Sequence, residues 1–131
     1  MINRVILVGF VGREPEVRSL ETGVKIARIS LATTERYTDS HGERQENTQW
    51  HSLVCWRAQA DFVERWVHTG AQVYIEGKLR YREITDAAGR HYQAAEVHCD
   101  LVRQIVRATS EAKEPLTAVA DLTIGNDNLP F

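Results

Sequence analysis

The chain has few of the residues and patterns on which several large classes of protein depend. Its two cysteines, Cys55 and Cys99, are too few for a disulfide scaffold or a four-cysteine zinc site. No apolar run approaches the roughly 18 residues that a membrane-spanning helix needs. The sequence starts directly with a strand-like pattern that contains Arg4, without the layout of a signal peptide. We therefore expect a cytoplasmic protein whose cysteines are reduced and packed.

Motifs of the common enzyme classes are also absent. The sequence contains no glycine-rich phosphate-binding loop and no Gly-x-Ser-x-Gly nucleophile motif. His51 and Cys55 alternate onto one strand face, but His98 and Cys99 point in opposite directions, and no carboxylate cluster completes a metal-binding set. We expect no catalytic activity, metal or cofactor, and we interpret His51 as a packed residue or a subunit contact.

The charge balance is not that of a strongly basic protein. Residues 1–107 carry 15 Lys and Arg against 14 Asp and Glu, whereas residues 108–131 carry one Lys against four acidic residues. Any nucleic-acid binding must therefore depend on the local placement of arginines and on aromatic stacking.

The 131 residues, 43% hydrophobic and 26% charged, fit one globular domain with a short extension.

Five segments have the pattern of β-strands and one has the pattern of a helix. Strands are expected at residues 2–11, 24–37, 48–57, 71–83 and 91–107, with a loop at 38–47 and a hairpin turn at 86–89. A helix is expected over residues 57–69, and its buried face is predicted to carry Phe62, Val63, Trp66 and Val67. Three strands, one helix and two strands is the order of the oligonucleotide/oligosaccharide-binding (OB) fold, an all-β, five-stranded Greek-key barrel with one helix between strands three and four.

The first predicted strand is apolar on both faces. Ile6, Val8 and Phe10 share one face, and the residues between them share the other. A barrel of about 107 residues has one interior, so one of these faces needs a different cover. We therefore predict that Ile6, Val8 and Phe10 line a subunit contact and that the protein is a homo-oligomer.

Trp50 and Trp56 share one face of the third predicted strand, because side chains alternate along a strand. Leu53 and Cys55 alternate to the other face and suit a narrow barrel interior, which would place both tryptophans outside, about 20 Å apart. Exposed aromatic rings stack on nucleobases whatever the identity of the base. The alternative, that the rings are core or subunit contacts, stays open from the pattern alone. Tyr37, near the predicted loop, could extend the row.

Basic residues are the second ingredient of a nucleic-acid site. Lys78, Arg80 and Arg82 share one face of the fourth predicted strand. With three further arginines they could follow a phosphate backbone. The candidate phosphate contacts are Arg4, Arg18, Lys78, Arg80, Arg82 and Arg90. Taken singly, each of them is better explained as a solvated surface charge, and the case for phosphate contacts depends on their occurrence together with the tryptophans.

The periodic pattern fades after residue 107, so residues 1–107 are the predicted folded domain and residues 108–131 a flexible tail. The last six residues, 126–131, combine an acid, apolar residues and a terminal ring beside the α-carboxylate. Such a tip can place its ring in a pocket of a partner while the carboxylate meets a basic residue. The candidate tip residues are Asp127, Leu129, Pro130 and Phe131; a frayed end without function is the alternative.

Several stretches taken together resemble the bacterial single-stranded DNA-binding protein family. They are NRVILVG at residues 3–9, GREPEVR at 12–18, SLAT at 30–33, TQWH at 48–51, QVYIEGKLR at 72–80, Tyr92, EV at 96–97 and LPF at 129–131. The resemblance implies an OB-fold homotetramer, associated with the nucleoid, that binds and protects single-stranded DNA without sequence preference. It also implies roles in replication, recombination and repair, with partner enzymes recruited through the tip.

On this resemblance, the stacking positions of the family fall on Tyr37, Trp50 and Trp56, and a fourth falls on Ile84. Ile84 is a departure, because an aliphatic side chain makes only a weaker apolar contact with a base. The tail is also a departure, because Asp127 is the only acid among the last six residues, where the family usually has several. The alternative function is that of an OB-fold adaptor subunit of a replication-restart complex, which would use its aromatic residues for protein contacts.

Overall fold

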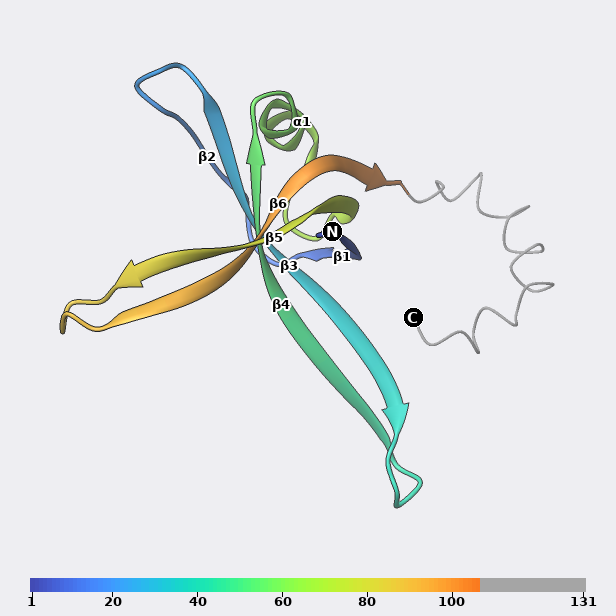
Figure 1. The fold of residues 1–131 in the computed structure, drawn as a ribbon. Helices are drawn as coiled ribbons and strands as arrows, with labels where there is room; N and C mark the ends of the chain where they lie inside the picture. Colours follow the sequence, from blue (N-terminus) through green and yellow to red (C-terminus); the bar gives the residue numbers. More distant parts are fainter. Residues whose placement is uncertain (107–131) are drawn as a thin grey trace. The chain divides into compact units, whose positions relative to one another are not determined.

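The computed structural model describes residues 1–106, and this part of the chain forms six β-strands and one α-helix (Figure 1). In chain order they are β1 (Val5–Val11), β2 (Glu16–Ser19), β3 (Lys25–Thr38), β4 (Arg44–Trp56), α1 (Ala58–Trp66), β5 (Gln72–Thr85) and β6 (His91–Ile105). The barrel unit comprises Met1–Thr33 and Gln49–Ile105, and the hairpin Thr34–Thr48 is described by itself. Within residues 1–106, no helix is long and apolar enough to cross a membrane.

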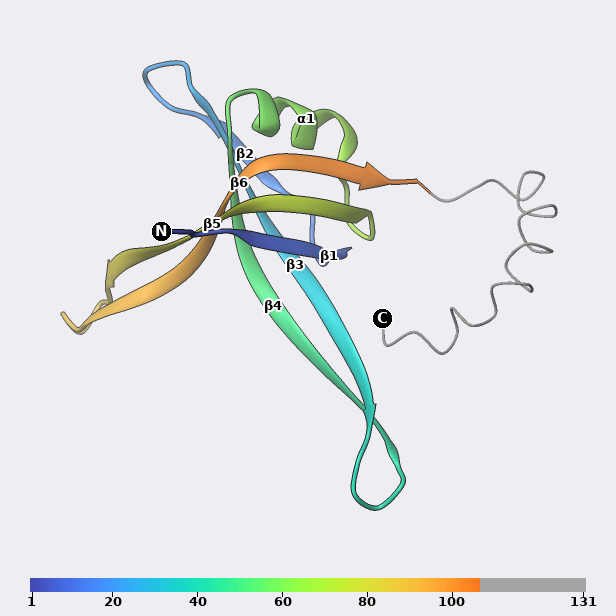
Figure 2. The same ribbon diagram turned by 45° about the vertical axis from the view of Figure 1, so that its right-hand side comes forward.

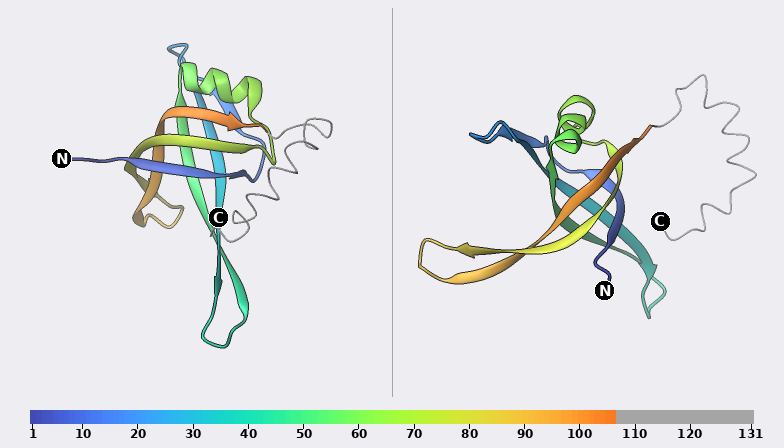
Figure 3. Two further views of the ribbon diagram at one scale, coloured as in Figure 1. Left: turned by 90° about the vertical axis from the view of Figure 1, so that its right-hand side faces the viewer. Right: turned by 45° about the horizontal axis from the view of Figure 1, so that its top comes forward.

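The strands other than β2 close into a barrel. The sheet order is β1-β5-β6-β4-β3-β2, and β1 also pairs with β3, where Phe10 lies opposite Ala32 and Val11 opposite Leu31. β1, β5 and β6 lie side by side and cross β3 and β4 (Figures 2 and 3). β4 and β6 run parallel. With α1 between β4 and β5, this arrangement confirms the predicted OB fold.

Closure of the barrel depends on a glycine in β1. A Cβ atom on Gly9 would lie 2.2 Å from the carbonyl oxygen of Ala32 in β3. This separation is much shorter than a van der Waals contact, so any larger residue would force β1 and β3 apart. The glycine at this position therefore lets the backbones of β1 and β3 approach closely enough to close the barrel.

The barrel interior is packed with aliphatic side chains and holds both cysteines. Leu31, Leu53 and Ile75 are among its largest fully buried side chains. Cys55 and Cys99 are buried in the same core as free thiols, as the sequence predicted. A hydrogen bond with the Cys99 thiol, together with burial, raises the pKa of Cys55 well above its ordinary value.

The helix α1 packs against β6 with one narrow face. Ala60, Val63 and Val67 are buried, and the side-chain oxygen Oε1 of Gln59 accepts a hydrogen bond from the backbone N–H of Val102 in β6 at 3.0 Å. The prediction that Trp66 belongs to the buried face is wrong, because its side chain is 53% exposed. The helix ends at residue 66, before the predicted end at residue 69, since Val67 already has an extended backbone.

Two further local predictions need correction. Residues Glu16–Ser19 form a strand of four residues, β2, that pairs with β3 and that is missing from the five predicted strands. The predicted loop at 38–47 is shorter, because β3 continues to Thr38 and β4 begins at Arg44. Asp39 explains the tight turn between them: its carboxylate accepts hydrogen bonds from the backbone N–H groups of His41 and Glu43, both at 2.9 Å.

Candidate nucleic-acid interface

The outer face of β4 presents two tryptophans. Trp50 is 61% exposed and Trp56 is 38% exposed, whereas Leu53 and Cys55, which alternate with them, are buried in the barrel. The alternation along this strand therefore places the rings outside the core, as predicted from the sequence. Each ring leaves part of its surface available for a planar ligand.

The Trp50 ring lies against the backbone of Gly12. A Cβ atom on Gly12 would be 2.3 Å from Cζ3 of the indole, so the ring occupies the space that any other residue would need for its side chain. The backbone N–H of Gly12 donates to the carbonyl oxygen of Ser30 at 2.9 Å, which fixes this segment beside β3. The fixed backbone at Gly12 therefore supports one side of the Trp50 ring.

Trp56 is held by a histidine of the neighbouring strand β6. The rings of Trp56 and His98 stack with their centroids 6.2 Å apart and their planes 27° apart. The indole Nε1–H also donates to Nδ1 of His98 at 3.3 Å, and Nε2 of His98 lies 3.5 Å from Oε1 of Glu96. A chain of polar contacts therefore connects the exposed Trp56 ring to Glu96.

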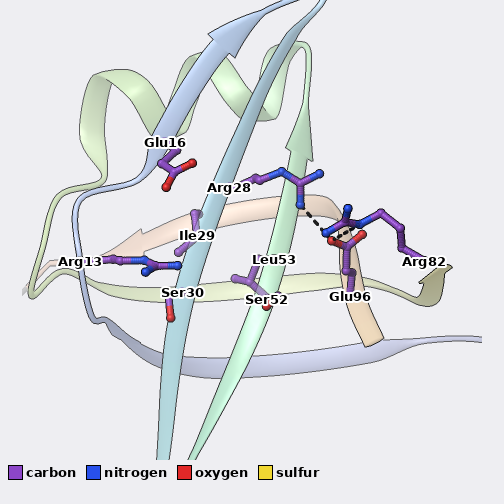
Figure 4. Close-up of a pocket in the computed structure, with 9 residues that line it drawn as sticks. All are labelled: Arg13, Glu16, Arg28, Ile29, Ser30, Ser52, Leu53, Arg82 and Glu96. Atoms are coloured by element: carbon purple, nitrogen blue, oxygen red, sulfur yellow. Dashed lines mark hydrogen bonds and ion pairs between the residues drawn. The ribbon is translucent and has the colours of Figure 1, made fainter. Parts of the chain in front are cut away.

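Glu96 is a buried carboxylate, 4% exposed, that binds two arginines from different strands. Its Oε2 atom accepts hydrogen bonds from Nη1 of Arg28 at 2.9 Å and from Nε of Arg82 at 3.1 Å (Figure 4). Burial by itself raises the pKa of Glu96, but the hydrogen bonds and positive charges of Arg28 and Arg82 outweigh it and hold the pKa below its usual value. Glu96 is therefore ionised at neutral pH and fixes both guanidinium groups.

These arginines border a pocket of about 230 Å³ on the barrel unit. Its lining includes three arginines, Arg13, Arg28 and Arg82, and two carboxylates, Glu16 and Glu96 (Figure 4). Three positive charges against two negative ones leave a net charge of +1 at the pocket. A guanidinium has five N–H donors, so Arg28 and Arg82 retain donors beyond those given to Glu96. The pocket can therefore accept an anionic group such as a phosphate.

The six basic residues predicted to contact phosphates differ in their surroundings. Arg82 binds Glu96, Arg4 pairs with Glu76, and Arg90 pairs with Asp86 at 3.3 Å. The other three, for which no ion pair occurs within residues 1–106, are Arg18, Lys78 and Arg80. All six are exposed to solvent.

The hairpin Thr34–Thr48 contains the third predicted stacking residue, Tyr37. Its side chain is exposed. Across the hairpin, Nε of Arg36 donates to Oε1 of Glu46 at 2.8 Å, and the hydroxyl oxygens of Thr34 and Thr48 lie 3.0 Å apart. Cross-strand contacts of this kind stabilise the extension of β3 and β4.

The outer face of β1 has the exposure that its pattern predicted. Ile6, Val8 and Phe10 are exposed on the barrel unit, whereas Val11 is buried in its core. His51, the fourth predicted subunit contact, is half-buried, and its Nε2 atom lies 2.8 Å from the hydroxyl oxygen of Thr33. The predicted tip residues Asp127, Leu129, Pro130 and Phe131 lie outside the described residues.

Comparison with known proteins assigns the chain to a family. The model of the single-strand binding protein family matches residues 2–105, most of the chain. The chain belongs to the single-strand binding protein family. This membership confirms the family predicted from the sequence stretches quoted above.

Within the described residues 1–106, the structure holds no group of His, Cys, Asp and Glu side chains suited to a metal ion.

Two solved structures of the single-strand binding protein family are similar to the barrel. One is the structure of the Plasmodium falciparum protein in complex with single-stranded DNA, which is 28% identical, with a TM-score of 0.74. That match covers 81% of this chain and 97% of the Plasmodium chain. The other is a deletion mutant of the Thermus aquaticus protein, 23% identical, with a TM-score of 0.70, covering 80% of this chain and 51% of the other. The second likeness concerns the fold alone.

Sequence reasoning missed several members of this site. Arg13, Arg28, Glu96 and His98 were not among the predicted contacts, although the structure places all four near Trp56 or Arg82. The hairpin turn at 86–89 contained a usable signal, because the register that it sets pairs Arg82 with Ala94, two residues from Glu96 on the same face of the sheet. The contact between Arg28 and Glu96 had no such signal, because 68 positions separate them in the chain.

Proposed function

We propose that this chain binds single-stranded DNA without sequence preference and protects it during replication, recombination and repair, at the nucleoid in the cytoplasm. The observation that carries the proposal is the pair of exposed rings, Trp50 and Trp56, on the outer face of one barrel strand. Base stacking on such rings contributes about 1–3 kcal/mol per base and tolerates any sequence. Membership of the family and the likeness to the Plasmodium falciparum protein, solved in complex with single-stranded DNA, support the same function.

In this proposal, bases stack on Trp50, Trp56 and Tyr37 while arginines and lysines contact the phosphates. The phosphate contacts are Arg4, Arg18, Lys78, Arg80, Arg82 and Arg90. Of the six, Arg82 has the strongest structural support as a phosphate contact. Glu96 fixes one side of its guanidinium group, and further N–H donors remain for an anion. Positioning by a buried carboxylate lowers the entropy that the arginine loses when DNA binds.

Titration with poly(dT) at several salt concentrations tests the function directly. Single-stranded DNA should quench the tryptophan fluorescence, and log K should fall linearly as log [salt] rises. Replacing Arg80 and Arg82 together by Gln should reduce the magnitude of that slope by about 1.4, since each single-strand phosphate contact contributes about 0.7. Arg65→Gln, on the exposed surface of α1, is the matched control and should leave the slope unchanged.

Two results would contradict this assignment. Tryptophan fluorescence that does not respond to DNA would favour an adaptor that uses its aromatic residues for protein contacts. A weaker complex with an unchanged salt slope in the double arginine variant would point to altered folding or stacking instead of lost phosphate contacts.

The outer face of β1 supports a proposed homo-oligomer, with four chains as the family resemblance suggests. Ile6, Val8 and Phe10 form an apolar row on one strand, and His51 is the further contact proposed. A row of this kind is expected to be covered by another subunit. Sedimentation equilibrium at micromolar concentration should give a mass above that of one chain, and Val8→Glu should lower it. A monomeric mass for the unmodified protein would refute the assembly.

The last residues are proposed to recruit replication and repair enzymes. Phe131 supplies a ring and the terminal carboxylate, while Pro130 limits the backbone freedom lost on docking. Deleting residues 129–131 should abolish partner binding and change DNA affinity little, as measured by titrating the full and the shortened chains with a helicase and with poly(dT). Phe131→Ala should weaken partner binding more than Asp127→Asn. The opposite ranking would show that charge carries the recognition.

A further inference from the structure

The strands β5 and β6 extend from the barrel as an arm (Figure 1). The arm carries two exposed tyrosines, Tyr81 on β5 and Tyr92 on β6. Tyr81 is 63% exposed and Tyr92 is 50% exposed. In the antiparallel register, Tyr92 lies opposite Ile84 and Tyr81 lies opposite Ala95. Directly opposed residues of paired strands project from the same face of a sheet. Tyr92 and Ile84 therefore share one face of the arm, and Tyr81 lies on the other.

The face that carries Tyr92 is the face that carries the site around Glu96. Tyr92, Glu96 and His98 are separated by even numbers of residues on β6, with no register shift between them, so their side chains share one side. His98 stacks on Trp56, and Glu96 binds Arg82. Along the strand, Tyr92 is six residues from His98, which corresponds to about 20 Å.

Tyr92 has none of the contacts that usually account for a tyrosine ring on a sheet. Within residues 1–106 its hydroxyl forms no hydrogen bond and its ring stacks on no other ring. Ile84, directly opposite, is half-buried and provides aliphatic support beside it. An exposed ring beside an aliphatic side chain offers a flat apolar surface to a planar ligand.

We propose that Tyr92 is a base-stacking position for single-stranded DNA, on a path that runs along the β5–β6 arm from Trp56 to Tyr92. The proposal rests on the proposed function of this site. Arg28 and Arg82 lie between the two aromatic positions, where they can contact the phosphates of the intervening nucleotides. The order along the path is therefore an aromatic ring, two guanidinium groups and a second aromatic ring, which matches the alternation of bases and phosphates.

The test compares the two tyrosines of the arm in the full chain. The unmodified protein and the variants Tyr92→Ala, Tyr92→Leu, Tyr92→Phe and Tyr81→Ala are titrated with poly(dT) at one salt concentration. Tyr92→Ala and Tyr92→Leu should weaken binding by roughly 5- to 150-fold, as expected for the loss of one stacked base. Tyr92→Phe keeps the ring and should stay within about twofold of the unmodified protein. Tyr81→Ala, which removes a more exposed ring from the opposite face, should do the same.

The outcomes separate this proposal from the proposed function. If the unmodified protein does not bind poly(dT), the function itself fails. If it binds, and Tyr92→Leu binds as tightly as Tyr81→Ala, the function stands and the Tyr92 position is overturned. Tyr92→Leu keeps an apolar cover over Ile84, so an effect on affinity without a change in melting temperature reports the ring alone. A change in sedimentation mass without a change in affinity would assign Tyr92 to a subunit contact and would also overturn the proposal.

Discussion

Replacing Trp50 and Trp56 together by Ala should weaken the binding of poly(dT) by about 2–6 kcal/mol, twice the contribution of one stacked base. The two rings are six residues apart on β4, about 20 Å, and rest on different neighbours. Trp50 lies against Gly12, whereas Trp56 stacks on His98. Because the rings are far apart and share no neighbour, the losses of binding free energy in the two single variants should add up to nearly the loss in the double variant. Fluorescence or anisotropy titration of labelled oligonucleotides at fixed salt measures each affinity.

The control for this prediction is the third tryptophan. Trp66 is 53% exposed on α1, so Trp66→Ala should change neither DNA affinity nor the melting temperature appreciably. The variant Gly12→Ala tests the placement of the Trp50 ring, because the added Cβ atom would displace the indole from its position against residue 12. It should reproduce part of the loss seen in Trp50→Ala. Unchanged affinity in both single tryptophan variants would refute stacking on this face.

Glu96→Gln should lower the free energy of unfolding by about 2 kcal/mol at neutral pH, because a neutral amide replaces the charged acceptor of two arginine hydrogen bonds. The pKa of Glu96 in the folded protein lies below its usual value of 4.5. The ionised carboxylate therefore contributes its full stabilisation above about pH 4.5 and loses it as the pH falls through the folded-state pKa. The difference between the two proteins should shrink on acidification.

Urea denaturation of both proteins between pH 3 and pH 7 measures this difference. Asp100→Asn is the matched control, since Asp100 is an exposed acid on the same strand for which the described residues provide no ion pair. It should leave the stability nearly constant across the range. A stability gap between unmodified protein and Glu96→Gln that widens at low pH would contradict the assigned role of Glu96.

The sequence was sufficient to predict the barrel and the exposure of its two β4 tryptophans. In β4, Leu53 and Cys55 alternate with Ser52, Val54 and Trp56, and their suitability for a narrow interior indicates which side of the strand faces the core. The same argument identified the apolar outer face of β1, where exposed residues alternate with more buried ones. In both cases the prediction of which residues are exposed used only the alternation of side chains along one strand.

The features that escaped prediction depend on contacts between distant segments. The side of α1 that is buried is decided by β6, so the helical spacing of Val63 and Trp66 alone could not show that only the first is covered. The short strand β2 exists because β3 provides its hydrogen-bonding partner. The ion pair of Arg28 with Glu96 likewise requires the closed barrel, which brings β3 and β6 to the same side of the pocket.

The burial of both thiols has a practical consequence for site-specific labelling. Maleimides react with thiolates, and Cys55, with its raised pKa, is fully enclosed, while Cys99 is 7% exposed. These are the only two cysteines in the sequence, so the folded protein should give almost no background reaction. A single engineered thiol, such as Tyr81→Cys on the far face of the arm, could then carry a dye. With a second dye on poly(dT), energy transfer would then report the proposed DNA binding without removing either native cysteine from the core.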